Sequence, residues 1–234
     1  RGHRRVLESA VARARELRGE AWVLTFDQHP LAVLAPARRP PLLTPLPLRL
    51  ENVATTGMDG CLMLPFTPLL AAMEPADFVS MLTGGRGDLI AEIRCGDHWR
   101  FGARASGTPD GLARFGRPFN LKVVTVPAEL YRNEPISSTR IRKTIRAGRV
   151  AEARAMLGRD YIIRETVVRG RGVGRTIGMA TANLHPHAEV LPSVGVYAVK
   201  TWIGDRELQG VADIGWRPTF REARPAAPVL EIHL

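Results

Sequence analysis

Two segments of this 234-residue chain carry side chains that commonly hold nucleotide phosphates. The first runs Ile136-Ser137-Ser138-Thr139-Arg140-Ile141-Arg142, and the second is a glycine-rich stretch that leads into Thr181-Ala182-Asn183. Hydroxyls and free N–H groups at a helix start, arginine guanidinium groups, and glycines that let the backbone approach a polyanion all favour phosphate binding. Two such segments predict two reactions, or two uses of one nucleotide.

The first segment is typical of a helix start. Its three hydroxyl residues, Ser137-Ser138-Thr139, can cap the helix and leave its positive end facing a triphosphate, with Arg142 one turn further on. Simple capping explains the same residues, so this motif alone leaves both interpretations open. Gly2-His3 precedes the first expected helix, where an imidazole could meet the same phosphates, although an isolated histidine there is more often inert.

The glycine-rich stretch suits a kinase-type site, and its candidate residues for holding ATP or flavin are Gly170, Gly172, Gly174, Arg175 and Gly178. Thr181 and Asn183 follow with a hydroxyl and an amide oxygen, which Mg²⁺ accepts alongside phosphate oxygens and water. A kinase also needs a base for the attacking hydroxyl, and Glu231 on the last expected strand is the leading carboxylate, although a solvated strand residue would look the same. A metal site at His185 and His187 is not expected, because no third ligand lies at a useful spacing.

Apolar segments at helical and strand-like spacing indicate two domains. Residues 1–158 alternate strands with helices and predict a doubly wound α/β domain with a parallel sheet. The expected helices cover residues 6–17, 47–56, 75–82 and 110–115 and one that starts at Ser137, and the expected strands cover 21–26, 61–64, 88–95 and 121–126. After Leu157-Gly158-Arg159, β-branched segments at 161–168, 194–203, 208–214 and 229–234 predict an all-β domain over 159–234, a barrel or part of one.

Composition narrows the function classes. The chain has 33 Lys and Arg against 23 Asp and Glu, a net charge of +10, but the basic residues are scattered, so nucleic acid is not an expected partner. No apolar run approaches the roughly 20 residues of a membrane span, and the cytoplasm is the expected location. Cys61 and Cys95 are too few for a disulfide framework and are expected as reduced thiols in a core. The sequence leaves the oligomeric state open.

Taken together, several motifs resemble the bacterial bifunctional riboflavin kinase/FMN adenylyltransferase family, also called FAD synthetase. The residues that carry the resemblance are Gly2-His3, Thr25-Phe26-Asp27-Gln28-His29-Pro30, Arg100-Phe101-Gly102, Ile136 to Arg142, Leu157-Gly158-Arg159, Thr181-Ala182-Asn183, Gly195-Val196-Tyr197 and Arg217-Pro218-Thr219. They span essentially the whole chain in order. The resemblance implies a Rossmann-like nucleotidyltransferase domain that adenylylates FMN to FAD, followed by a riboflavin-kinase-type β-barrel that phosphorylates riboflavin to FMN.

The resemblance also implies roles for particular residues, with ATP as co-substrate and Mg²⁺ as cofactor of both reactions. His3 would be catalytic and stabilise charge on the transferring phosphate, while Gly2 and the segment Ser137-Ser138-Thr139 with Arg142 would hold the triphosphate. In the kinase half, the glycine loop would embrace ATP, Thr181 and Asn183 would place Mg²⁺, and Glu231 would take the proton from the ribityl hydroxyl. The candidate flavin contacts of the first domain are Phe26, His29, His98 and Phe101.

The chain also departs from the family pattern. It starts at Arg1-Gly2-His3 without the first strand and stops at Leu234 before the expected end of the barrel, so we expect a piece of a longer protein. His98, Met179-Ala180 and Asp213 stand where the family has other residues. Two alternatives therefore stay open: a riboflavin kinase alone, and a flavin- or nucleotide-binding protein without catalysis.

Overall fold

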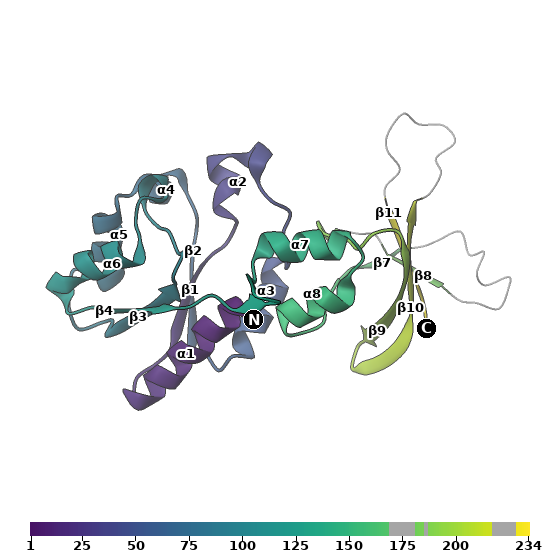
Figure 1. The fold of residues 1–234 in the computed structure, drawn as a ribbon, viewed down its shortest axis with the longest axis horizontal. Helices are drawn as coiled ribbons and strands as arrows, with labels where there is room; N and C mark the ends of the chain where they lie inside the picture. The colour runs from purple at the N-terminus through teal and green to yellow at the C-terminus, as the bar shows by residue number, and fades with distance from the viewer. Residues whose placement is uncertain (169–180, 185–186, 217–227) are drawn as a thin grey trace. The chain divides into compact units, whose positions relative to one another are not determined.

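The computed structural model describes residues 1–168, 181–184, 187–216 and 228–234 (Figure 1). The chain divides into two compact units. One contains Arg1–Pro40 and Thr44–Ile136, and the other contains Pro41–Leu43 and Ser137–Leu234. The domain boundary that we expected after residue 158 lies inside the second unit and stays a prediction.

The strands of the first unit form parallel pairs, as the alternation of strands and helices predicts. The pairs are β1 (Trp22–Phe26) with β2 (Gly60–Leu64) and β3 (Glu92–Gly96) with β4 (Lys122–Val126). The parallel direction is confirmed, but within the described residues no strand hydrogen-bonds to both pairs, so they do not make one continuous sheet. The expected strand at 88–95 begins only at Glu92, and a short unexpected hairpin follows β4, formed by β5 (Leu130–Tyr131) and β6 (Glu134–Pro135).

Helices cover the strands of the first unit (Figure 1). Helix α1 (Gly2–Glu16) packs against β3, and α6 (Pro109–Gly116) packs against both β4 and α5 (Pro75–Thr83). Helices α5 and α6 contribute to a core cluster of buried apolar residues: Phe78, Val79, Phe101, Leu112 and Leu121. The remaining elements are α2 (Pro30–Leu34), α3 (Leu46–Ala54), α4 (Pro68–Ala72) and the short 3₁₀ turns Pro36–Arg38, Ala103–Ala105 and Arg117–Phe119. The expected helices are confirmed, whereas α2, α4 and, in the second unit, α8 (Val150–Leu157) were missed.

The second unit combines two helices with an antiparallel sheet. Helix α7 (Ser138–Arg146) packs against α8 (Val150–Leu157), and α8 ends at Gly158, whose φ of 74° lies in the left-handed region that glycine adopts readily. The sheet has five strands in the order β7-β8-β11-β10-β9. They are β7 (Val167–Val168), β8 (Thr181–Leu184), β9 (Gly195–Ile203), β10 (Arg206–Trp216) and β11 (Pro228–His233).

Two expectations need correction, and the expectation of a barrel or part of one is met only as an open sheet. The strand expected at 161–168 is wrong over residues 161–166, where Tyr161 instead donates its hydroxyl to the Val190 carbonyl at 2.7 Å. The described strands form an open sheet, and their pairing does not close a barrel. Both cysteines are free, as expected, but only Cys95 is buried, because Cys61 lies on the exposed part of β2.

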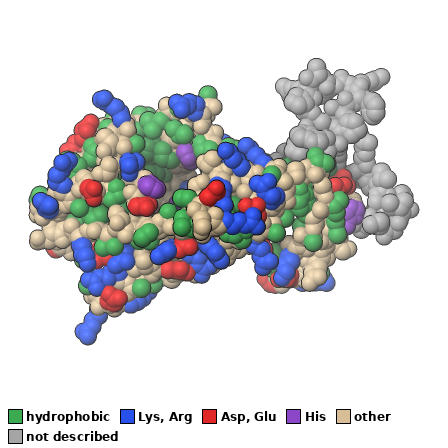
Figure 2. Space-filling model, viewed as in Figure 1, with side chains coloured by type: hydrophobic (Ala, Val, Ile, Leu, Met, Phe, Trp, Pro, Cys, Tyr) green, Lys and Arg blue, Asp and Glu red, His purple; other side chains and the backbone are tan. Residues whose placement is uncertain are grey.

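The surface carries charge of both signs. On the face drawn in Figure 2, Lys and Arg side chains are dispersed among acidic and apolar ones rather than gathered in one continuous patch. Across the described ranges, no helix has both the length and the apolar character needed to cross a membrane.

Candidate active-site residues

The predicted kinase residues meet on the antiparallel sheet. In its register, Asn183 of β8 lies directly opposite Glu231 of β11, and Glu231 lies directly opposite Asp213 of β10. Residues directly opposite one another point to the same face, as do residues two apart on one strand. Thr181, which lies opposite His233, therefore belongs to the same face as Asn183. The sheet thus collects a hydroxyl, an amide and two carboxylates on one side, which we call the polar face.

The other face of this sheet is apolar. Ala212, Ile214 and Leu230 are buried there as a cluster. Partly buried neighbours pack against it: Ile163, Leu184, Tyr197, Val199 and Ile232. Because strand residues alternate between the faces, burial of this cluster fixes which residues are left for chemistry. The sheet therefore separates the residues that stabilise it from those predicted to act on a substrate.

The environment of the polar face differs from residue to residue. Asn183 is only 7% exposed, Glu231 and Thr181 are half-buried, and Asp213 is exposed. A hydroxyl, an amide oxygen and carboxylates suit Mg²⁺ when phosphate oxygens and water complete its coordination. In the described part of the chain, no three His, Cys, Asp or Glu side chains group as a metal site, so these residues alone do not form a closed cage. The glycine-loop candidates at 170–178 lie outside the described residues.

The start of α7 shows how Ser137 and Arg142 are used. Ser137 is the N-cap residue, and its hydroxyl accepts a hydrogen bond from the Arg140 N–H at 3.2 Å. Ser137, Ser138 and Thr139 are all exposed, and the first turn carries no acidic residue that would oppose an anion. Arg142 donates from Nε to the Pro41 carbonyl at 2.6 Å, and burial is the main cause that lowers the pKa of its guanidinium. Capping is thus confirmed for Ser137, and the phosphate role of the segment stays a prediction.

Gly2 and His3 lie in the first turn of α1, whose N-cap residue Arg1 makes no side-chain cap. His3 is solvent-exposed. Partial desolvation is the main cause that lowers the pKa of its imidazole. Desolvation favours a neutral ring, which can still donate a hydrogen bond from one nitrogen.

The loop after β1 is joined to the loop after β2. The Phe26 ring packs edge-on against Phe66 at 4.9 Å, and Asp27 Oδ1 accepts from the Phe66 N–H at 2.9 Å. The Phe26 carbonyl accepts from the guanidinium of Arg49 on α3. His29 accepts from the Leu31 N–H at its Nδ1 and thereby caps α2. Two of the candidate flavin residues are therefore held at the carboxyl ends of parallel strands, where open α/β sheets bind ligands.

The other two flavin candidates follow β3 and differ in burial. The His98 side chain is 83% exposed. Phe101 is buried in the core of the first unit, and its ring stacks on Trp99 with a centroid distance of 4.7 Å. His98 is thus accessible, whereas Phe101 has a packing role.

Sequence reasoning missed two kinds of residue. Arg49 holds the loop after β1 in place through the Phe26 carbonyl, but an arginine on a helix carries no distinctive signal. Asp213 was noted only as a departure, yet the register brings it opposite Glu231. The available signal was the alternation of Asp213 with apolar residues along β10. The sequence did not show that Glu231 would be its partner on the neighbouring strand.

Comparison with known proteins agrees with this division of residues. A family model described as FAD synthetase matches residues 1–140, and one described as riboflavin kinase matches residues 157–234. The fold and the two matches define a transferase with a nucleotidyltransferase domain ahead of a kinase domain. The chain belongs to the bifunctional riboflavin kinase/FMN adenylyltransferase family.

Named relatives support this membership. The bifunctional riboflavin kinase/FMN adenylyltransferase of Escherichia coli K12 is 33% identical, covering 100% of this chain and 74% of that protein. The protein of the same name from Bacillus subtilis is 31% identical, covering 100% of this chain and 73% of that protein. A crystal structure described as a macrolide-efflux protein from Streptococcus pneumoniae matches with a TM-score of 0.83 at 27% identity, over 99% of this chain and 74% of that one. That likeness concerns the fold.

Proposed function

We propose that this protein phosphorylates riboflavin to FMN and then adenylylates FMN to FAD, with ATP as co-substrate of both reactions. The observation that carries the proposal is the order of the two family matches, FAD synthetase over residues 1–140 and riboflavin kinase over 157–234. The polar face of the antiparallel sheet supports the kinase half, because it presents the residues that phosphoryl transfer requires.

In the kinase half, Glu231 accepts the proton of the riboflavin hydroxyl that attacks the γ-phosphate of ATP. Its position opposite Asn183 supports this role, since cross-strand neighbours have Cβ atoms roughly 5 Å apart, close enough for both to contact one phosphoryl group. Thr181 and Asn183 provide the oxygens that would hold Mg²⁺, which supplies positive charge to the phosphates when it is bound. The glycines of the segment 170–178 and Arg175 are the predicted nucleotide contacts and lie outside the described residues.

In the adenylyltransferase half, an FMN phosphate oxygen attacks the α-phosphate of ATP and pyrophosphate leaves. The family resemblance makes Gly2, His3, the hydroxyl segment 137–139 and Arg142 the predicted contacts of the triphosphate. The exposure of residues 137–139 at a helix start supports this assignment. His29 and His98 contact the flavin, and Phe26 supports the loop that carries His29. No covalent enzyme intermediate is required, because positioning and charge neutralisation suffice.

Chromatography of flavins tests the proposal. The intact protein is incubated with ATP and Mg²⁺ and either riboflavin or FMN, and the products are separated. We expect FAD from both substrates. FMN from riboflavin with no FAD from either would leave a riboflavin kinase alone, and binding without any product would indicate a non-catalytic flavin- or nucleotide-binding protein.

A further inference from the structure

A buried carboxylate outside the residues assigned so far holds the chain beyond β8. The Glu165 side chain is only 1% exposed. Its Oε1 accepts from the backbone N–H groups of His187 at 2.8 Å and Ala188 at 2.6 Å, and its Oε2 lies 2.9 Å from Nδ1 of the His187 ring. An ionised carboxylate is costly to bury without such partners, and hydrogen bonds to a charged group are about twice as strong as neutral ones. Glu165 therefore holds residues 187 and 188 firmly in place, and we call this set of contacts the Glu165 tie.

The tie lies at the edge of the sheet that carries the proposed Mg²⁺ ligands. Strand β7 pairs with β8 through Val167 opposite Leu184 and Val168 opposite Asn183. Glu165 precedes β7 and His187 follows β8, so the side chain of Glu165 links the two segments beyond the last backbone pair. Among the described residues, β7 and β8 share just two residue pairs, so a third connection adds substantially to their alignment.

Alignment of β8 decides which of its side chains reach the polar face. A shift of one residue would turn Thr181 and Asn183 toward the apolar cluster and bring Ala182 and Leu184 to the polar face. Smaller displacements would move the Asn183 amide away from Glu231. The four residue pairs between β8 and β11 keep the sheet together without Glu165. Loss of Glu165 is therefore expected to loosen β8 rather than unfold the sheet.

We propose that Glu165 is a positioning residue for the kinase reaction: by binding the backbone at His187 and Ala188, it fixes β8 and so places Thr181 and Asn183 beside Glu231. This inference rests on the proposed function, in which Thr181 and Asn183 hold Mg²⁺ against ATP. Glu165 itself touches neither ligand nor substrate in this assignment. Residues that orient metal ligands typically change metal affinity or activity about 10- to 100-fold when they are lost.

Three variants separate the contributions of the contacts that Glu165 makes with the backbone and with the His187 ring. Glu165→Ala removes every contact, Glu165→Gln keeps an oxygen for the backbone N–H groups but loses the charge, and His187→Ala removes only the ring contact. The matched control is Glu207→Gln, because Glu207 lies in the same sheet but is 44% exposed and pairs with Lys200 on the surface. For each protein, FMN formation from riboflavin is measured as a function of Mg²⁺, and FAD formation from FMN is measured in the same preparation.

We expect the Mg²⁺ concentration for half-maximal FMN formation to rise about tenfold in Glu165→Ala and by a smaller factor in Glu165→Gln. FAD formation should stay within about twofold, and Glu207→Gln should match the unmodified protein. Amide hydrogen exchange, which needs no activity, should accelerate at His187 and Ala188 in Glu165→Ala. An unchanged Mg²⁺ requirement, an equal fall in both activities, or unchanged exchange would overturn the inference.

The inference and the proposed function can fail separately. Asn183→Ala tests the metal site itself: if this variant still forms FMN normally, the assignment of the Mg²⁺ ligands fails, and the role of Glu165 fails with it. If Asn183→Ala stops FMN formation while both Glu165 variants keep the normal Mg²⁺ requirement, only the positioning role of Glu165 is refuted.

Discussion

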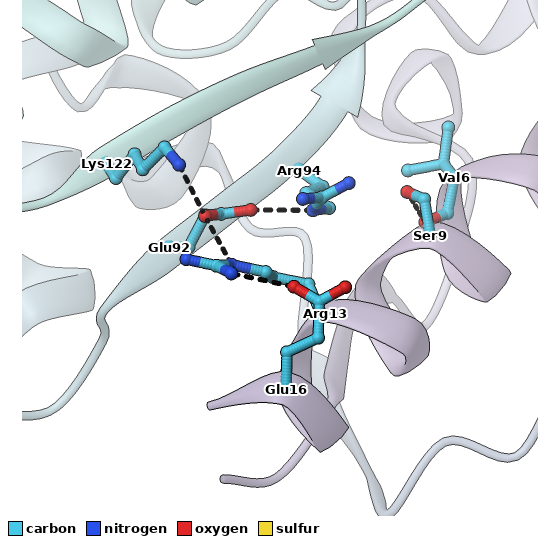
Figure 3. Close-up of polar contacts among 7 residues, drawn as sticks. All are labelled: Val6, Ser9, Arg13, Glu16, Glu92, Arg94 and Lys122. Carbon is cyan, nitrogen blue, oxygen red and sulfur yellow. Dashed lines mark hydrogen bonds and ion pairs between the residues drawn. The ribbon is translucent and has the colours of Figure 1, made fainter. Parts of the chain in front are cut away.

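Replacing Glu92 by glutamine tests how the first unit holds α1 against its strands. The Glu92 carboxylate, whose side chain is 5% exposed, lies among three cations from three elements (Figure 3). Arg94 of β3 binds it at 2.7 Å, and Arg13 of α1 and Lys122 of β4 each lie 3.3 Å from it. Burial alone would raise the pKa of Glu92, but hydrogen bonds from Arg94 and Lys122 outweigh burial and lower it.

The expected loss of stability in Glu92→Gln follows from how exposed each of the three cations is. Arg94 is 20% exposed and makes the short contact, and a hydrogen bond between charged groups contributes about 1.5–3 kcal/mol. Arg13 is 30% exposed and keeps its second partner Glu16, so its share of the loss is smaller than that of Arg94. Lys122 is 61% exposed and adds little. We therefore expect Glu92→Gln to lower the free energy of unfolding of the first unit by about 3 kcal/mol.

Urea unfolding measures this loss. Phenylalanine at Trp202 and Trp216 leaves Trp22 and Trp99 as fluorescence reporters of the first unit. The matched control is Glu8→Gln, whose partner Arg4 also binds at 2.7 Å but in an exposed pair, so its loss should stay below about 0.5 kcal/mol. Because the pKa of Glu92 is lowered in the folded state, its contribution is present above the ordinary carboxyl pKa and is lost as pH falls through the folded value. Equal losses in the two variants at pH 7 would refute the reasoning.

Three further outcomes are expected. Asn183→Ala should abolish FMN formation and leave FAD formation from FMN largely intact, as flavin chromatography would show; equal loss of both would contradict separate sites. Burial raises the pKa of Tyr161 to about 12, so its stabilisation is complete below pH 10 and is lost as pH rises through 12. Tyr161→Phe should therefore cost about 1 kcal/mol in unfolding experiments at pH 8 and progressively less above pH 10, and a constant difference would argue against this. Gly148→Ala should cost about 2 kcal/mol in thermal unfolding, because φ is +74° and the new Cβ would lie 2.5 Å from Ser193 Oγ, whereas Gly204→Ala, with φ +58° and open space, should cost about half as much; equal costs would exclude the clash.

The sequence predicts best where a signal is local. Apolar residues at helical spacing located α1, and Ser137 marked the start of α7, since caps depend on a few neighbouring residues. Helices α2 and α4 were missed because five residues are too few to show a period. The strand expected over 161–168 failed because alternation predicts a strand only where a partner is available, and residues 161–166 have none in the described sheet.

The site was predictable by residue type but not by arrangement. Thr181, Asn183 and Glu231 could be named because hydroxyl, amide and carboxylate groups suit phosphoryl transfer. Their meeting depends on pairing between distant segments, and a single sequence contains no measure of that register. Glu165 shows the same limit more sharply, because nothing near it in the sequence indicates that its carboxylate is buried against the backbone at His187.

The two faces of the antiparallel sheet impose different demands on the same strands. The apolar cluster around Leu230 tolerates no register other than the one that buries it, and that register also sets Glu231 opposite Asn183. Burial of the apolar cluster thus fixes the strand register to within one residue. A one-residue step is large compared with the precision that phosphoryl transfer requires in the positions of its reacting groups. Finer placement must come from polar ties at the strand ends, where the apolar face exerts little control. A buried carboxylate bound to two backbone N–H groups beyond β8 meets that need, which is why its loss should affect the kinase reaction before it affects the fold.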